Sequence, residues 1–199
     1  MNIENYNKWH ILINSILLLI VSIYSWINEI LEESYFHNII LKYNLYLGFI
    51  LFVISEIMLF LSLFISYFYN NEIYIGITSI NAYNIPLLNT AILYFSGITI
   101  TISLLTKRKD YLLYTIILGI IFTILQVYEY YECNFSITDS FYGSIFYILT
   151  GLHGIHVIMG TIFLILTLKN IIYMKPSILY WHFVDYVWLI LFICIYIKH

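Results

Sequence analysis

Long runs of apolar residues, separated by short polar stretches, constrain this chain more than any other feature. A helix needs about 20 mostly apolar residues to cross about 30 Å of hydrocarbon. Six runs approach or exceed that length, and they cover residues 11–27, 43–69, 86–106, 111–131, 141–168 and 178–197. Because the runs are continuous and do not alternate apolar with polar residues, they exclude the strands of a transmembrane barrel. The sequence therefore predicts an all-α integral membrane bundle of six transmembrane helices, forming a single transmembrane domain over residues 1–199.

Composition supports a membrane protein and excludes several other classes. The chain is 62% hydrophobic and only 10% charged, whereas soluble domains are usually about 45–50% apolar and about 25% charged. This excludes a soluble enzyme and a disordered segment, and the net charge of −3 leaves no basic surface for nucleic acid. Isoleucine is abundant, and there are 21 tyrosines but only two alanines. This bias is typical of an AT-rich organelle genome, so we expect an organelle-encoded chain that needs no import signal.

The basic residues are distributed unevenly over the predicted loops. Six of the eight lie in the loops 28–42, 107–110 and 169–177, which share one side of a six-span bundle; only Lys8 and Lys198 lie on the other side. By the positive-inside rule, we expect these three loops to face the cytoplasm or the matrix of an organelle.

Capping residues predict where individual helices begin. Asp110, and Asp139 with Ser140, stand where the N-caps of the fourth and fifth helices are expected. Pro176 is expected to break the chain just before the sixth helix.

Five ionisable residues fall inside the predicted spans: Glu56, His153, His156, His182 and Asp185. A charge at the bilayer centre costs about 2.5–3.5 kcal/mol, whereas an interhelical hydrogen bond returns about 0.6 kcal/mol on average. We therefore expect each acid to be neutral, paired, or facing water or another subunit. Burial favours a neutral carboxyl, so Glu56 is interpreted either as a proton-relay or lipid-facing acid, or as a neutral carboxyl bonded to a neighbouring helix.

The intramembrane histidines and Asp185 allow two interpretations. His153 and His156 share one helix face, as do His182 and Asp185, and such side chains suit iron or zinc. The other three histidines lie at the termini or in a loop, so ligands for a di-iron enzyme are too few. Four of the eight glycines lie in the fifth span and allow close helix contact. We therefore expect a structural polar network in which Asp185 pairs with His182 or with a histidine of the fifth span, and no metal site or catalytic centre.

Sequence motifs run in order along the chain. The last span reads YWHFVDYVWLILFICIY from Tyr180, and the fifth carries TGLHGIHVIMGTIFL from Thr150. The fourth ends in LQVYEYYE, the third opens with PLLNT at Pro86, and the second contains the pair Ser55–Glu56. Together these motifs resemble subunit III of the haem-copper oxidases, most closely the mitochondrial cytochrome c oxidase subunit III family.

The resemblance implies a correspondence of helices and of lipid-binding residues. The family has seven helices, and Trp26–Phe36 resembles the end of its second, so the six spans correspond to family helices two to seven. The first helix is then lost or supplied by a separate chain. The family binds phospholipid in the cleft between its first two helices and the other five, which makes Trp26 and Glu33 lipid-cleft candidates and Glu56 the counterpart of the family's buried glutamate.

The resemblance also implies a supporting function in respiratory complex IV, a proton-translocating oxidoreductase of the mitochondrial inner membrane. Haem and copper are expected in partner subunits and not in this chain, which would pack directly on subunit I. It would support assembly, stability and proton uptake, bind phospholipids, and have its basic loops on the matrix side. The alternatives are subunit III of a bacterial quinol oxidase and a freestanding membrane metalloenzyme built on His153, His156, His182 and Asp185.

Overall fold

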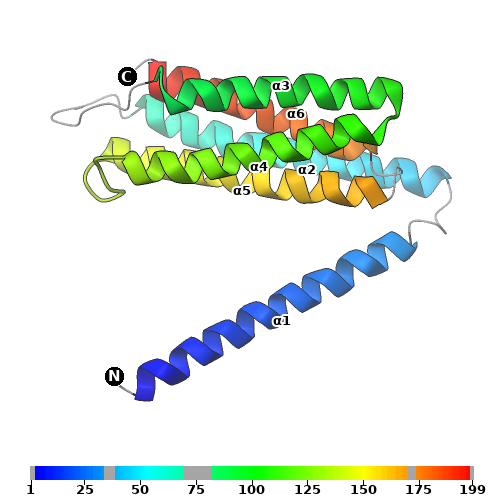
Figure 1. Ribbon diagram of the computed structural model, residues 1–199, viewed down its shortest axis with the longest axis horizontal. Helices are drawn as coiled ribbons and strands as arrows, with labels where there is room; N and C mark the ends of the chain where they lie inside the picture. The colour runs from blue at the N-terminus through cyan, green and yellow to red at the C-terminus, as the bar shows by residue number, and fades with distance from the viewer. Residues whose placement is uncertain (1–2, 34–38, 70–81, 170–173, 198–199) are drawn as a thin grey trace. The chain divides into compact units, whose positions relative to one another are not determined.

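The computed structural model describes residues 3–33, 39–69, 82–169 and 174–197, and every element in these ranges is a helix, as predicted (Figure 1). The elements in chain order are α1 (Ile3–Glu33), α2 (Ile39–Tyr69), α3 (Ile85–Thr106), α4 (Lys109–Glu132), α5 (Phe141–Lys169), α6 (Met174–Leu191) and the short π-helix η2 (Phe192–Ile197).

Five helical stretches are long and apolar enough to cross a membrane, and they cover Tyr43–Tyr69, Ile85–Thr106, Lys109–Glu132, Phe141–Leu168 and Met174–Ile197. The apolar part described in α1 is shorter and covers His10–Ser22. Thus α1 is a long helix in which polar residues flank a short apolar stretch. The described residues support a multi-pass membrane protein with five membrane-length helices and one shorter apolar helix.

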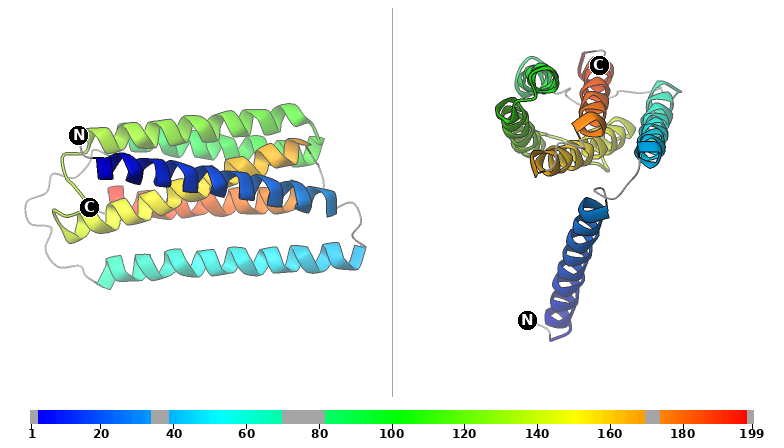
Figure 2. Two further views of the ribbon diagram at one scale, coloured as in Figure 1. Left: turned by 90° about the horizontal axis from the view of Figure 1, so that it is seen from below. Right: turned by 90° about the vertical axis from the view of Figure 1, so that its right-hand side faces the viewer.

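The chain divides into two compact units, Met1–Tyr46 and Leu47–His199. In the first unit, α1 has exposed apolar side chains from Ile11 to Val21, and serine hydroxyls donate to carbonyl oxygens of the same helix. In the second unit, α3 packs on α4, α4 on α5, α5 on α6, and α6 on α3 (Figure 2, right). The part of α2 that follows Tyr46 belongs to the second unit and contacts α5 and α6 through aromatic side chains. Phe49 contacts Phe163 of α5, and Phe60 contacts Phe183 of α6.

The indole of Trp181 fills a slot at the centre of the second unit. Its side chain is fully buried, and Nε1 donates to Ser96 Oγ on α3 at 2.9 Å. A Cβ atom at Gly119 of α4 would lie 2.6 Å from the indole, and one at Gly160 of α5 would lie 3.1 Å from it. The two glycines therefore make room for the ring, which lets α6 contact three helices at once.

Two predicted helix starts are wrong, by two residues for α4 and by four residues for α6. Helix α4 begins at Lys109 with Arg108 as its N-cap, so Asp110 lies inside the first turn. Helix α6 begins at Met174, two residues before Pro176. Proline is tolerated there because the N–H groups of a first turn have no acceptor within the helix.

Side-chain hydrogen bonds hold the loop between α4 and α5. The Gly143 N–H donates to Ser140 Oγ at 2.9 Å, so Ser140 caps α5 as predicted. Asp139 instead binds the loop itself, because the N–H and the hydroxyl of Ser136 donate to its two carboxylate oxygens at 2.6 and 2.7 Å. The hydrogen bond from the Ser136 backbone N–H, with a smaller effect of the Ser136 hydroxyl, holds the pKa of Asp139 below its usual range.

This loop is expected to loosen in acid and on removal of the carboxylate. Because the folded pKa of Asp139 lies below its usual value, its contribution is complete above that usual value and is lost as the pH falls through the lowered pKa. Hydrogen exchange measured by mass spectrometry, corrected for intrinsic rates, should show Ser136 less protected in Asp139→Ala at neutral pH. Asp110→Ala, which changes the α3–α4 connection, is the matched control. Equal protection of Ser136 in the unmodified protein, Asp139→Ala and Asp110→Ala would contradict the prediction.

Candidate functional site

Glu56 of α2 and His156 of α5 form a pair that contains one hydrogen. Glu56 Oε2 lies 2.9 Å from His156 Nε2. The other ring nitrogen, Nδ1, lies 2.7 Å from the carbonyl oxygen of Leu152, and because a carbonyl only accepts, Nδ1 carries a hydrogen. The contact between Nε2 and Oε2 is therefore either a neutral pair with the hydrogen on Glu56 or an ion pair with it on His156. In both states each of these atoms has a hydrogen-bond partner.

Aromatic rings enclose this pair on the bundle side. The edge of Phe60 approaches His156 with ring centroids 5.1 Å apart, Phe183 does so at 5.9 Å, and Tyr180 stacks on the same ring. The side chains of His156 and Glu56 remain 12% and 20% exposed, respectively. The low polarity around the pair strengthens its hydrogen bond.

His153 lies in the core of the bundle and packs as an aromatic ring. It is fully buried between Phe122 of α4 and Trp188 of α6, with ring centroids 5.6 and 5.0 Å away. Neither of its ring nitrogens has a hydrogen-bond partner among the residues that the structure describes. Within the described residues, His153 therefore makes no hydrogen bond to the polar network that the sequence analysis predicted for it.

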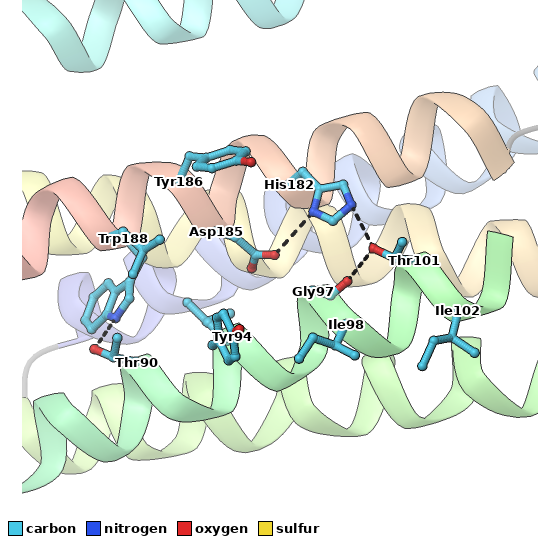
Figure 3. Close-up of a pocket in the computed structure, with 12 residues that line it drawn as sticks. Thr90, Tyr94, Gly97, Ile98, Thr101, Ile102, His182, Asp185, Tyr186 and Trp188 are labelled. Carbon is cyan, nitrogen blue, oxygen red and sulfur yellow. Dashed lines mark hydrogen bonds and ion pairs between the residues drawn. The ribbon is translucent and has the colours of Figure 1, made fainter. Parts of the chain in front are cut away.

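His182 and Asp185 lie one turn apart on α6, facing α3 (Figure 3). His182 Nδ1 is 3.7 Å from Asp185 Oδ2, which is too long for a hydrogen bond. His182 Nε2 lies 3.4 Å from Thr101 Oγ1 of α3, and that hydroxyl donates to the Gly97 carbonyl oxygen at 2.7 Å. The Thr101 oxygen therefore accepts from His182, which leaves Asp185 as the weakly partnered member of this cluster.

These side chains lie in an open groove of about 340 Å³ between α3 and α6, which we call the α3–α6 groove. Its α3 wall includes Tyr94, Gly97 and Ile98, and its α6 wall includes Tyr186 and Leu189 (Figure 3). Ile98 and Leu189 are exposed at the rim of the groove, whereas the less exposed Asp185 side chain forms part of its floor.

The three histidines and Asp185 do not form one ligand set. His156 is paired with Glu56, His153 lies in the aromatic core, and His182 and Asp185 line the α3–α6 groove. Within the described ranges, no group of three or more His, Cys, Asp or Glu side chains could hold a metal ion. The ligand cluster that the metalloenzyme alternative requires is therefore not assembled by these four residues.

A second buried acid lies where α4 meets η2. The Tyr196 hydroxyl donates to Glu129 Oε1 at 2.5 Å, and Glu129 is 2% exposed. Asn89 and Gln126 are also buried, with no partner for their amide atoms among the described residues. Sequence reasoning singled out none of these as site residues, and the signal that points to them is a polar side chain inside an apolar span, which is costly to bury even when uncharged.

Two sequence candidates are not placed by the structure. Trp26 and Glu33 fall in α1, but their side chains lie outside the described residues. Their assignment to a lipid cleft therefore stays a prediction.

A bundle of membrane-length helices with its ionisable side chains dispersed among interhelical contacts defines a multi-pass integral membrane protein. The comparison with protein families then specifies which one: the model described as cytochrome c oxidase subunit III matches residues 1–199. The chain belongs to the cytochrome c oxidase subunit III family.

Individual relatives agree with the family assignment. Cytochrome c oxidase subunit 3 of Patiria pectinifera is 38% identical over 95% of this chain and 84% of the relative. The subunit 3 proteins of Paracentrotus lividus and Drosophila melanogaster are each 40% identical, over 94% and 90% of this chain and 83% and 80% of the relatives. The predicted resemblance is confirmed.

Proposed function

We propose that this chain is a non-catalytic core subunit of mitochondrial cytochrome c oxidase that supports the assembly, stability and proton uptake of the subunit carrying the haems. The observation that carries the proposal is the family match over the whole chain. It is supported by the site, because the intramembrane acids and histidines are distributed among separate helix contacts. Haem and copper would reside in partner subunits, with subunit I packed directly against this chain.

The proposed topology has six spans, with α1 as the first. Its short apolar stretch, His10–Ser22, would cross the bilayer with help from the flanking helical turns, because helix α1 is 31 residues long. The basic loops 28–42, 107–110 and 169–177 would face the matrix side of the inner membrane, following the charge bias.

The Glu56–His156 pair is the proposed link to proton uptake. A shared hydrogen can move between Oε2 and Nε2 without either side chain losing its partner. The pair is partly exposed, so it would hold a proton near the surface of the bundle. Phospholipids would occupy the lipid cleft, with Trp26 and Glu33 as its candidate residues.

Purification of the native complex through this chain tests the proposal. The expected result is a reduced-minus-oxidised spectrum with haem bands, together with subunit I and the dinuclear copper centre of a cytochrome c oxidase. Isolation of the chain in a complex without haem would overturn the proposal. Haem without the copper centre, with quinol oxidation, would instead indicate the quinol oxidase alternative.

A further inference from the structure

The floor of the α3–α6 groove contains a carboxyl at mid-membrane depth that receives no hydrogen bond from the residues that the structure describes. Asp185 is the twelfth of the 24 residues in the span Met174–Ile197, which places it near the bilayer centre. Its side chain is 14% exposed, and the contact with His182 is 3.7 Å long. Its Oδ1 atom is buried without a hydrogen-bond partner among the residues described.

The α3 wall beside Asp185 contains small residues among larger apolar ones. A Cβ atom at Gly97 would lie 2.8 Å from Asp185 Oδ2, so only glycine lets the carboxyl lie against α3. Thr90 and Thr101 line the same wall, and small residues in a row allow another helix to approach closely. Around this polar floor the rim is apolar and exposed, with Ile98 at 41% and Leu189 at 37%.

The depth of the carboxyl decides which kind of molecule can satisfy it. Acyl chains offer no hydrogen-bond donor, and lipid headgroups lie at the membrane surface, about 15 Å away from the centre of a hydrocarbon layer that is about 30 Å thick. An unsatisfied acid at this depth is costly and usually faces a partner or water. A side chain on a neighbouring transmembrane helix can supply a donor at this depth.

We propose that the α3–α6 groove receives a transmembrane helix of a partner subunit, which donates a hydrogen bond to Asp185 from a basic or amide side chain at mid-membrane depth. The helix packs its small or apolar residues against Gly97 and Ile98, and its donor reaches the Asp185 carboxyl beside His182. This inference rests on membership in the oxidase complex and adds a specific contact surface and the chemistry of the residue that occupies it.

A density map of the native complex tests the contact directly. The expected result is a helix of another subunit in the groove, with a side-chain nitrogen within about 3.2 Å of an Asp185 carboxylate oxygen. Lipid or detergent alone, helix α1 of this same chain, or an empty groove would each overturn the inference. Haem and subunit I would still be visible in those cases, so failure of this inference is distinguishable from failure of the proposed function.

Matched substitutions test it independently of the map. Ile98→Trp places a bulky ring in the groove while leaving Asp185 intact, and should lower the amount of the partner subunit recovered with this chain by about tenfold or more after detergent washing. Ile124→Trp places the same ring on exposed α4, where Ile124 is 62% exposed and outside the groove, and should leave subunit content unchanged. Equal subunit content in both variants, measured by mass spectrometry, would overturn the inference.

Discussion

Trp181→Ala is expected to lower the free energy of unfolding of the Leu47–His199 unit by about 3–5 kcal/mol. The side chain is fully buried and occupies the slot between Gly119 and Gly160, so its removal leaves a cavity that three helix backbones surround. The bond from Nε1 to Ser96 Oγ is lost as well. Denaturant titration of the purified complex, followed by proteolysis and detection of this subunit, measures the change.

Three variants define how the Trp181 slot works. Trp181→Phe keeps an aromatic ring, and Ser96 still donates to the Leu93 carbonyl oxygen at 2.7 Å, so the loss should be smaller. Gly119→Ala adds a methyl group 2.6 Å from the indole and should destabilise the unit by about 1–3 kcal/mol through overpacking. Ile190→Ala, on the exposed side of α6, is the control with little effect. If Trp181→Ala lowered the free energy of unfolding no more than Ile190→Ala does, the stabilising role of the buried Trp181 ring would be contradicted.

Glu56→Leu is expected to cost about 1–3 kcal/mol, because it leaves His156 Nε2 without a partner in an apolar environment. Glu56→Gln should be nearly neutral, since an amide of the same size donates a hydrogen bond to the neutral imidazole. The same denaturant titration distinguishes the two variants. Complete failure of Glu56→Gln to assemble would show that an ionised carboxylate is required instead.

The double variant Glu56→Leu/His156→Phe gives the matched control for this pair. Replacing both partners by apolar side chains leaves no unsatisfied polar atom and should recover part of the stability lost in Glu56→Leu. Additive losses in the double variant would mean that the two side chains are not coupled. The contact at 2.9 Å predicts coupling.

Long-range pairing inside the membrane could not be predicted from the spacing of residues alone. His153 and His156 are three residues apart, yet one contacts Trp188 in the core and the other binds Glu56 on α2. Three residues are less than one full helical turn of about 3.6 residues. Two side chains on roughly the same face therefore point in somewhat different directions and can contact different helices. Likewise, the glycines of α5 indicated close packing, but not that Gly160 and Gly119 enclose one indole.

The sequence by itself determined that the chain is helical and spans a membrane. Hydrocarbon offers no hydrogen-bond partner to the backbone, and continuous apolar runs can satisfy their own backbone groups there only as helices. The sequence also identified the family, because its motifs occur in the same order as in the family and can be read without knowledge of the fold. Only the tertiary structure decided which polar side chains contact one another inside the membrane. Glu56 pairs with His156 and Glu129 with Tyr196, whereas Asp185 receives no hydrogen bond from the described residues. These pairings depend on how helices far apart in sequence rotate and pack against one another, and local residue patterns do not contain that information.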